Sequence, residues 1–312
     1  MNPALEGYAA AVVGATPADG RSALATDLAA VSRLFDDNVQ LRSALTDTSI
    51  PGPARRAVLV DLLDGQVGEP ARRAAGFAAQ AVSATEIPTA LDWLAHRAYR
   101  VAEGEAVTEE PLGHMAARRR VGGFASALFE GLDTAALEEM EDELFRFART
   151  VDATPELRSA LTDRELPLEL RQGVVHDLLS SKVQPATVAL VDYVLAGGRP
   201  RDVVGTLEWL VEQTAAARGW RVARVRSAVE VEDDQRQELA ATISAMVGAP
   251  VDVEVVIEPA LIGGAVVQIG DLQVDASARG RLDNLREHLT TSAWQERGAV
   301  FEGQDIEAEG AR

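Results

Sequence analysis

The sequence has 312 residues, more than one domain usually contains, and its 30 basic and 49 acidic residues give a net charge of −19. Such an acidic chain is repelled by nucleic-acid phosphates and by anionic lipid headgroups, so we expect no nucleic-acid partner and no basic membrane-binding patch. The lack of cysteine excludes disulfides and cysteine-based zinc sites, and the single lysine, Lys182, has no glycine frame for a phosphate-binding loop.

No targeting or membrane-spanning segment is expected. The first basic residue is Arg21, so residues 1–11 lack the positively charged start of a secretory signal. No stretch of the sequence approaches the roughly 18 uninterrupted apolar residues that a spanning helix needs. We therefore expect a cytoplasmic protein without direct membrane insertion, which reaches a membrane only through a partner.

An internal repeat with an offset of 116 residues organises most of the chain. The seven residues Leu41–Asp47 recur unchanged as Leu157–Asp163, and Gly7-Tyr8-Ala9 corresponds to Gly123-Phe124-Ala125 at the same offset. Matches that spread over about a hundred residues at one offset indicate a duplicated domain rather than a short solenoid unit.

Each copy of the repeat has the apolar spacing of short helices. The positions that show it are Leu24, Leu28, Val31 and Phe35 in copy one, and Leu137, Met140, Leu144 and Phe147 in copy two. Pro51 and Pro167 each mark a helix start. The apolar face that follows is Val58, Leu59, Leu62 and Leu63 in copy one, and Val174, Val175, Leu178 and Leu179 in copy two. With about six helices per copy, the sequence predicts two tandem six-helix bundles.

The stretch Gly104 to Arg120 lies between the copies and is interpreted as a linker. It ends in the triplet Arg118-Arg119-Arg120, which could indicate a nucleic-acid contact. In so acidic a chain, a lone basic triplet is far more often the solvated start of a helix, and we adopt that interpretation.

After Trp220 the apolar period changes from helical to two, which predicts strands. We expect a strand through Val225, Val229 and Val231, a helix over 233–247, and strands over 251–257, 265–269 and 272–274. A last helix is expected to begin at Ser277. The fold class is thus mainly α with a small α+β C-terminal domain. The expected domains are 1–112, 113–220 and 221–292, followed by a disordered acidic tail over 293–312.

No catalytic, metal or cofactor site is expected. The four histidines, His96, His114, His176 and His288, lie far apart in the sequence without a ligand spacing. Gly263-Gly264 lacks the third glycine of a phosphate cradle and is better explained as a tight turn. Asp271 and Asp275 are explained by a turn and by a helix start rather than by acid–base chemistry.

The C-terminal stretch carries a specific pattern: an acidic residue, Pro, any residue, Leu-Ile-Gly-Gly, then Ile-Gly-Asp, then Asp-x-Ser at the start of a helix. It resembles the signature of the delta subunit of F-type rotary ATP synthases, the family of the mitochondrial oligomycin-sensitivity-conferring protein. The matching residues are Glu258, Pro259, Leu261, Ile262, Gly263, Gly264, Ile269, Gly270, Asp271, Asp275, Ser277, Arg281 and Leu282. This chain departs from the family by Glu258 in place of Asp, by Ala276 in place of Gly, and by carrying the helical domain twice.

The resemblance implies a non-catalytic stator subunit, without a cofactor, on the cytoplasmic side of the cell membrane. In this family the helical domain holds the N-terminal helix of an alpha subunit between its first and fifth helices, and the C-terminal domain binds the b-subunit stalk. By position, the groove residues are Tyr8, Ala11, Val12, Phe77, Ala78 and Ala81 in copy one, and Phe124, Ala127, Leu128, Leu190, Tyr193 and Val194 in copy two.

We expect each bundle to bind one alpha-subunit N-terminal helix, with copy two, which adjoins the C-terminal domain, in the usual family position. The alternative is that copy one is a spacer or contacts the stalk. The alternative to a stator subunit is a free-standing helical scaffold or regulatory adaptor, whose C-terminal domain binds another ligand. Co-purification with alpha, beta and b chains separates these two interpretations.

Overall fold

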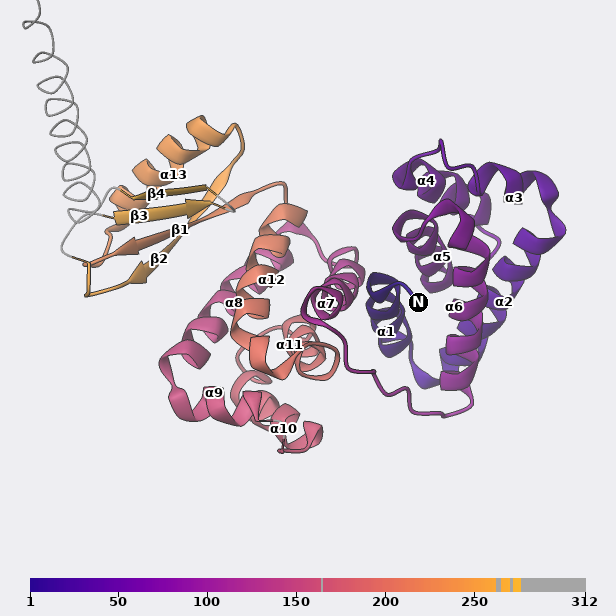
Figure 1. The fold of residues 1–312 in the computed structure, drawn as a ribbon, viewed down its shortest axis with the longest axis horizontal. Coiled ribbons are helices and arrows are strands. Elements are labelled where there is room, and N and C mark those ends of the chain that lie inside the picture. Colours follow the sequence, from indigo (N-terminus) through magenta and orange to yellow (C-terminus); the bar gives the residue numbers. More distant parts are fainter. Residues whose placement is uncertain (164, 262–264, 270–271, 276–312) are drawn as a thin grey trace, which may run out of the picture. The chain divides into compact units, whose positions relative to one another are not determined.

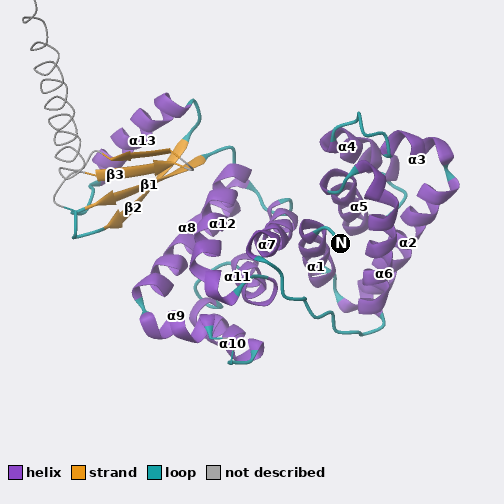
Figure 2. Cartoon of the chain, in the orientation of Figure 1, coloured by secondary structure: helices purple, strands orange, loops and turns teal. Residues whose placement is uncertain are grey.

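The computed structural model describes residues 1–163, 165–261, 265–269 and 272–275, and the chain divides into two compact units at Arg218/Gly219. The first unit is helical, and the second combines strands with a helix, as Figure 2 shows. The predicted fold class, mainly α with a small α+β part, is therefore confirmed. In the described part of the chain, no helix is both long and apolar enough to cross a bilayer.

Copy one of the repeat forms six helices (Figure 1). These are α1 (Pro3–Ala15), α2 (Arg21–Asp37), α3 (Val39–Leu45), α4 (Gly52–Leu63), α5 (Glu69–Ala81) and α6 (Ile87–Ala102). The Asn2 side chain caps α1 by accepting a hydrogen bond from the Ala4 amide at 2.9 Å. Pro51 directly precedes α4, as expected from its position in the repeat.

Copy two repeats the same order of helices. These are α7 (His114–Phe129), α8 (Thr134–Ala153), α9 (Pro155–Thr162), α10 (Leu168–Leu179), α11 (Pro185–Gly197) and α12 (Val203–Ala217). The pairing of α2 with α6 in copy one recurs as the pairing of α8 with α12. The predicted linker is wrong at its C-terminal end, because α7 begins at His114 and residues 114–120 are helical.

The expected apolar face of α4 is only half buried. Leu59 and Leu63 are 1% exposed, whereas Val58 and Leu62 are 51% and 44% exposed. The reason is the helical period: residues four apart lie on one face, and their neighbours point about 100° away from it. In copy two the equivalents of the buried pair, Val175 and Leu179, are also buried.

Two equivalent arginines in the repeat differ in their hydrogen bonds. The Nε and Nη2 atoms of Arg55 donate to the Ala79 and Val82 carbonyls, both at 3.0 Å. Arg171, at the same repeat position, is also buried, but its Nε and Nη1 atoms have no hydrogen-bond partner in the described part of the chain.

We therefore expect Arg55→Met to lower the free energy of unfolding by about 1–3 kcal/mol, because two buried carbonyls lose their donors. Arg171→Met should cost much less, or stabilise the chain, since it removes buried donors that lack partners. Urea unfolding of the two single variants measures both free energies of unfolding. Equal losses would contradict the difference in hydrogen bonding between Arg55 and Arg171.

The second unit contains a four-stranded sheet in the order β2-β1-β3-β4 and one described helix. Its elements are β1 (Arg221–Ser227), α13 (Asp233–Val247), β2 (Val251–Ile257), β3 (Ala265–Ile269) and β4 (Leu272–Asp275). β1 and β2 are parallel and joined through α13, and β3 pairs antiparallel with both β1 and β4. Ala223, Val225 and Ile243 belong to the core between the sheet and the helix.

The first strand of this unit is shorter than the sequence predicts. The expected strand continues to Val231, but β1 ends at Ser227, and Val229 beyond it is 69% exposed. The alternating valines therefore continue beyond Ser227, the last residue of β1 that pairs with a neighbouring strand. The last helix from Ser277, the acidic tail and the turns at Gly263-Gly264 and Gly270-Asp271 lie outside the described residues.

Candidate partner-binding site

An aromatic pair joins the first and fifth helices of each copy. In copy one, Tyr8 of α1 stacks on Phe77 of α5 with ring centroids 4.0 Å apart. In copy two, Phe124 of α7 stacks on Tyr193 of α11 at the same distance. The tyrosine and the phenylalanine have exchanged places between the copies, so the contact is preserved while the hydroxyl lies on a different helix.

Most of the predicted groove residues are buried. Ten of the twelve belong to the buried core, namely Tyr8, Ala11, Val12, Phe77, Ala78, Phe124, Ala127, Leu190, Tyr193 and Val194. The other two, Ala81 and Leu128, are half buried. The space between the first and fifth helices is thus largely filled by side chains of the first unit itself. Binding of a partner helix to these residues stays a prediction.

The first helices of the two copies, α1 and α7, pack directly against each other (Figure 1). A Cβ atom added to Gly7 would lie 1.7 Å from the carbonyl oxygen of Arg120, and one added to Gly123 would lie 1.8 Å from that of Ala4. Gly7 and Gly123 are equivalent in the repeat, as are Ala4 and Arg120. The crossing therefore has an internal pseudo-two-fold symmetry, and glycine allows the backbones to approach this closely.

Glu130, at the C-terminus of α7, binds three helices of copy one. Its Oε2 atom accepts from the Tyr8 hydroxyl at 2.7 Å and from Arg73 Nε at 3.1 Å, and its Oε1 atom accepts from Arg56 at 2.7 Å. A carboxylate is unfavourable at a helix C-terminus, and these donors offset that cost. Burial, together with the hydrogen bond to Glu130 and its charge, raises the pKa of Tyr8, so the hydroxyl stays protonated and donates a hydrogen bond to Glu130.

Arg120, on the N-terminal half of α7, is 1% exposed and joins both copies to the linker. Its Nε and Nη2 atoms donate to the Gly197 carbonyl of α11 at 2.9 and 2.7 Å, and Nη1 donates to the Glu110 carbonyl at 2.9 Å. Glu109 lies 3.4 Å from Arg120 and Glu6 of α1 lies 3.8 Å from it. Burial raises the pKa of Glu6, while the Arg120 charge opposes this shift.

Glu109 completes this network from the linker. It accepts from Arg97 of α6 at 3.0 Å and from the Tyr193 hydroxyl of α11 at 3.2 Å. Burial raises the pKa of Tyr193, so this hydroxyl also stays protonated and acts as a hydrogen-bond donor.

The expected solvated helix start is correct for Arg119 alone. Arg118 is half buried and pairs with Asp202, and Arg120 is buried. Charge composition cannot show which residue of the triplet points into the contact between the copies.

A cleft of about 230 Å³ opens where α1, α5 and α7 meet. It is lined by Ala11, Val12, Ala15, Thr16, Pro17, Glu69, Pro70, Arg73, Ala127 and Leu128. Four of these residues belong to the predicted grooves, two from each copy. Most of the lining residues are apolar, and Glu69 and Arg73 are the charged ones, so the cleft suits an apolar helix face rather than a phosphate or a metal.

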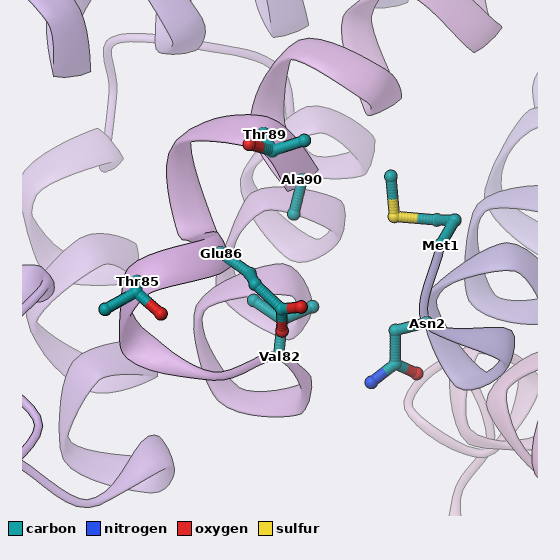
Figure 3. A pocket seen from close by; sticks show the side chains of 7 residues that line it. All are labelled: Met1, Asn2, Val82, Thr85, Glu86, Thr89 and Ala90. Carbon is teal, nitrogen blue, oxygen red and sulfur yellow. The ribbon is translucent and has the colours of Figure 1, made fainter.

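A second pocket, of about 520 Å³, lies within copy one and is lined by the residues in Figure 3. Its single side-chain carboxylate, Glu86, accepts from the Ser83 hydroxyl at 2.6 Å as part of a helix cap, and the other lining side chains are neutral. These side chains offer no acid–base pair.

The described residues contain no group of three or more His, Asp or Glu placed to hold a metal. Of the histidines, His96, His114 and His176 are exposed, and His288 lies outside the described residues. His114 pairs with Asp202 and His176 with Asp192, both at 2.7 Å. Burial raises the pKa of Asp192, and His176 opposes the shift.

Part of the C-terminal signature is described. Glu258 follows β2, lies 3.4 Å from Arg226, and donates its amide to the Ser227 carbonyl at 2.8 Å. The Leu261 amide donates a hydrogen bond to the Glu258 carbonyl at 3.0 Å, which closes a turn that contains Pro259. Ile269 ends β3 and Asp275 ends β4. The remaining signature residues, Ile262, Gly263, Gly264, Gly270, Asp271, Ser277, Arg281 and Leu282, lie outside the described residues.

Curated relatives match most of the chain. The ATP synthase subunit delta of Nocardia farcinica is 32% identical over 85% of this chain and 88% of its own length. That of Nocardioides sp. is 35% identical over 86% of this chain and 87% of its own length. Residues 113–312 are about two thirds of the chain, so these alignments extend into copy one.

Among solved structures, a chain of the mitochondrial ATP synthase hexamer of Toxoplasma gondii aligns with a TM-score of 0.37 at 17% identity. It covers 55% of this chain and 97% of that chain.

The family model described as "ATP synthase delta (OSCP) subunit" matches residues 122–289, more than half of the chain. This range runs from within α7 through copy two and into the second unit. The family match and the relatives at 32–35% identity agree with each other. The chain therefore belongs to the ATP synthase delta (OSCP) subunit family.

Proposed function

We propose that this chain is a peripheral-stalk subunit of the F-type proton-translocating ATP synthase, which ties the catalytic head to the membrane-anchored stalk. The observation that carries the proposal is the family match over residues 122–289, which spans copy two and most of the second unit. Because the rotor exerts torque on the head, a stator must hold the head in place. The role of this subunit is therefore mechanical rather than catalytic.

The two units have separate tasks in this proposal. The helical unit binds the N-terminal helix of an alpha subunit, and the C-terminal unit binds the C-terminal region of the b stalk. Copy two takes the usual family position in the chain order, directly before the C-terminal unit, and the family match from residue 122 onward supports this. Through the complex, the chain is held at the cytoplasmic side of the cell membrane.

The seat that we propose for an alpha helix is the cleft between α1, α5 and α7. It retains accessible space, whereas Leu190 and Val194 in copy two are fully buried. With α1 and α7 packed together, one helix per chain is accommodated there. A second helix binds at the predicted grooves only if α1 and α7 part.

The subunit itself is proposed to be non-catalytic. The family role is structural, and the pockets described above supply neither a phosphate cradle nor an acid–base pair. A pure preparation should therefore show no ATP turnover that a point substitution in this chain abolishes.

Titration with the N-terminal peptide of the alpha subunit tests the proposal by calorimetry. Ala15→Glu places a carboxylate in the cleft at an exposed position, so the chain should fold but lose at least about tenfold in affinity, since the bound helix would bury that charge against its apolar face. Ala44→Glu, exposed on α3 away from the cleft, is the matched control. Absence of binding in the parent chain would refute the head contact, and equal binding by both variants would refute the seat.

A peptide from the C-terminal end of the b stalk tests the other contact in the same way. Co-purification with alpha, beta and b chains from a membrane fraction tests the whole assignment. A chain recovered free of all three would instead support the scaffold or adaptor interpretation.

A further inference from the structure

The contact between the copies resembles a symmetric dimer interface within a single chain. In a two-fold interface, each partner presents the same patch to the other, and here the patch is the first-helix face around Gly7 and around its equivalent Gly123. Each glycine meets the other helix's backbone carbonyl rather than a side chain. The face of α1 around Gly7 is therefore covered by α7, and the face of α7 around Gly123 is covered by α1.

The linker is part of this contact rather than a free tether. Glu109 is bound by Arg97 of copy one and by Tyr193 and Arg120 of copy two, and its side chain is only 12% exposed. The Glu110 carbonyl accepts from Arg120 as well. Separation of the copies would break this cluster and leave buried charges without partners, which is costly.

A second cluster that joins the copies, centred on Glu130, lies at the C-terminal end of α7. Glu130 is ten residues beyond Arg120, so the Arg120 and Glu130 clusters are about 15 Å apart along the helix. Arg56 and Arg73 of copy one contact Glu130 from two different helices. A single cluster would leave the copies free to rotate about it, but two clusters on opposite sides of the Gly123 crossing resist both rotation and separation.

We infer that residues 1–218 move as one rigid body, in which the Gly7/Gly123 crossing and the Arg120 and Glu130 clusters lock the two copies together. Force then passes from copy one to copy two through packed helices instead of through the backbone of residues 103–113. This goes beyond the proposed function, since it concerns the geometry of the unit whatever partner it binds.

Spin-label distances test the inference directly, because the chain has no native cysteine to label. Val58→Cys on α4 and Glu139→Cys on α8 place exposed labels on different copies. Val58→Cys with Ala23→Cys on α2 places both labels within copy one, and gives the width of the distance distribution for a rigid pair of sites. In the full-length chain we expect each pair to give a distance distribution with a single peak, and the two peaks to have similar widths.

A flexible linker of this length would spread the distance between copies over a range on the order of 10–20 Å. Such a broad distribution in the parent chain would overturn the inference. This readout requires no partner peptide, so failure of the proposed function leaves it unaffected.

Two variants examine the cause of the rigidity. Gly7→Leu should broaden or shift the distance between the copies, whereas Gly14→Leu on the same helix, where an added Cβ meets nothing within 4 Å, should not. If Gly7→Leu does not fold, Glu130→Gln tests the Glu130 cluster, and Glu156→Gln at an exposed position is its control. A narrow, unchanged peak in a folded Gly7→Leu or in Glu130→Gln would show that the assigned contact does not hold the copies.

Discussion

Arg120→Met should lower the free energy of unfolding by about 3–5 kcal/mol, one of the largest losses expected for a single substitution in this chain. The guanidinium donates to the Gly197 and Glu110 carbonyls and lies beside the carboxylates of Glu109 and Glu6. Methionine replaces most of the volume but none of the donors. The two carbonyls then lose their donors, the half-buried Glu6 loses its arginine neighbour, and Glu109 keeps only Arg97.

The neighbouring arginine provides the control for this prediction. Arg119 is exposed on the same helix, so Arg119→Met should change stability by no more than about 0.5 kcal/mol. Arg120→Lys should recover only part of the loss, because a single ammonium group cannot donate in the fork geometry that reaches Gly197 and Glu110 together. Chemical denaturation of the three variants measures this order, and similar stability of the Arg119 and Arg120 variants would contradict it.

The duplicated helices were predictable because the repeat carries its own internal evidence. Identical segments such as Leu41–Asp47 and Leu157–Asp163 at one offset require two copies of one fold. Apolar positions at helical spacing, such as Leu28 and Val31, are buried as predicted. Within the second unit, the ranges expected for α13, β2 and β3 agree with the structure, since alternation and helical periods are clear there.

The contact between the copies could not be predicted from periodicity. Arg120 belongs to a basic triplet whose composition favours a solvated helix, and its burial depends on helices that are distant in the sequence. The groove residues follow from a resemblance to a family with one helical domain, in which no second copy covers them. Tyr8 and Phe124 each stack on the fifth helix of their own copy, and both lie on the first helices, which pack against each other.

One signal in the sequence did indicate this contact. Gly7 and Gly123 occupy the same position in both copies, in the middle of a helix, where glycine costs about 1 kcal/mol relative to alanine. A residue that is unfavourable in both copies has a packing reason, and here that reason is the close approach of two backbones.

Gly123→Ala should destabilise the chain by about 3 kcal/mol or more, although alanine is the better helix former. The added methyl carbon would lie 1.8 Å from the Ala4 carbonyl oxygen, 2.6 Å from the carbonyl carbon and 2.9 Å from the Cα atom. All three are backbone atoms, so no side-chain rotation relieves the overlap and α1 must move away from α7. That movement strains the hydrogen bonds of Tyr8 and Arg73 to Glu130, which adds to the cost.

Gly173→Ala is the matched control in the same copy. Gly173 lies within α10, and a Cβ atom added there meets nothing within 4 Å, so alanine should stabilise the chain by up to about 1 kcal/mol. Thermal unfolding should therefore shift in opposite directions, downward for Gly123→Ala and slightly upward for Gly173→Ala. The combination Gly7→Ala with Gly123→Ala should cost less than the two single losses together, because the first substitution already separates the helices that the second would push apart. Opposite shifts with full additivity would show that the two glycines act at independent contacts, and equal upward shifts would show that α1 and α7 do not pack this closely in solution.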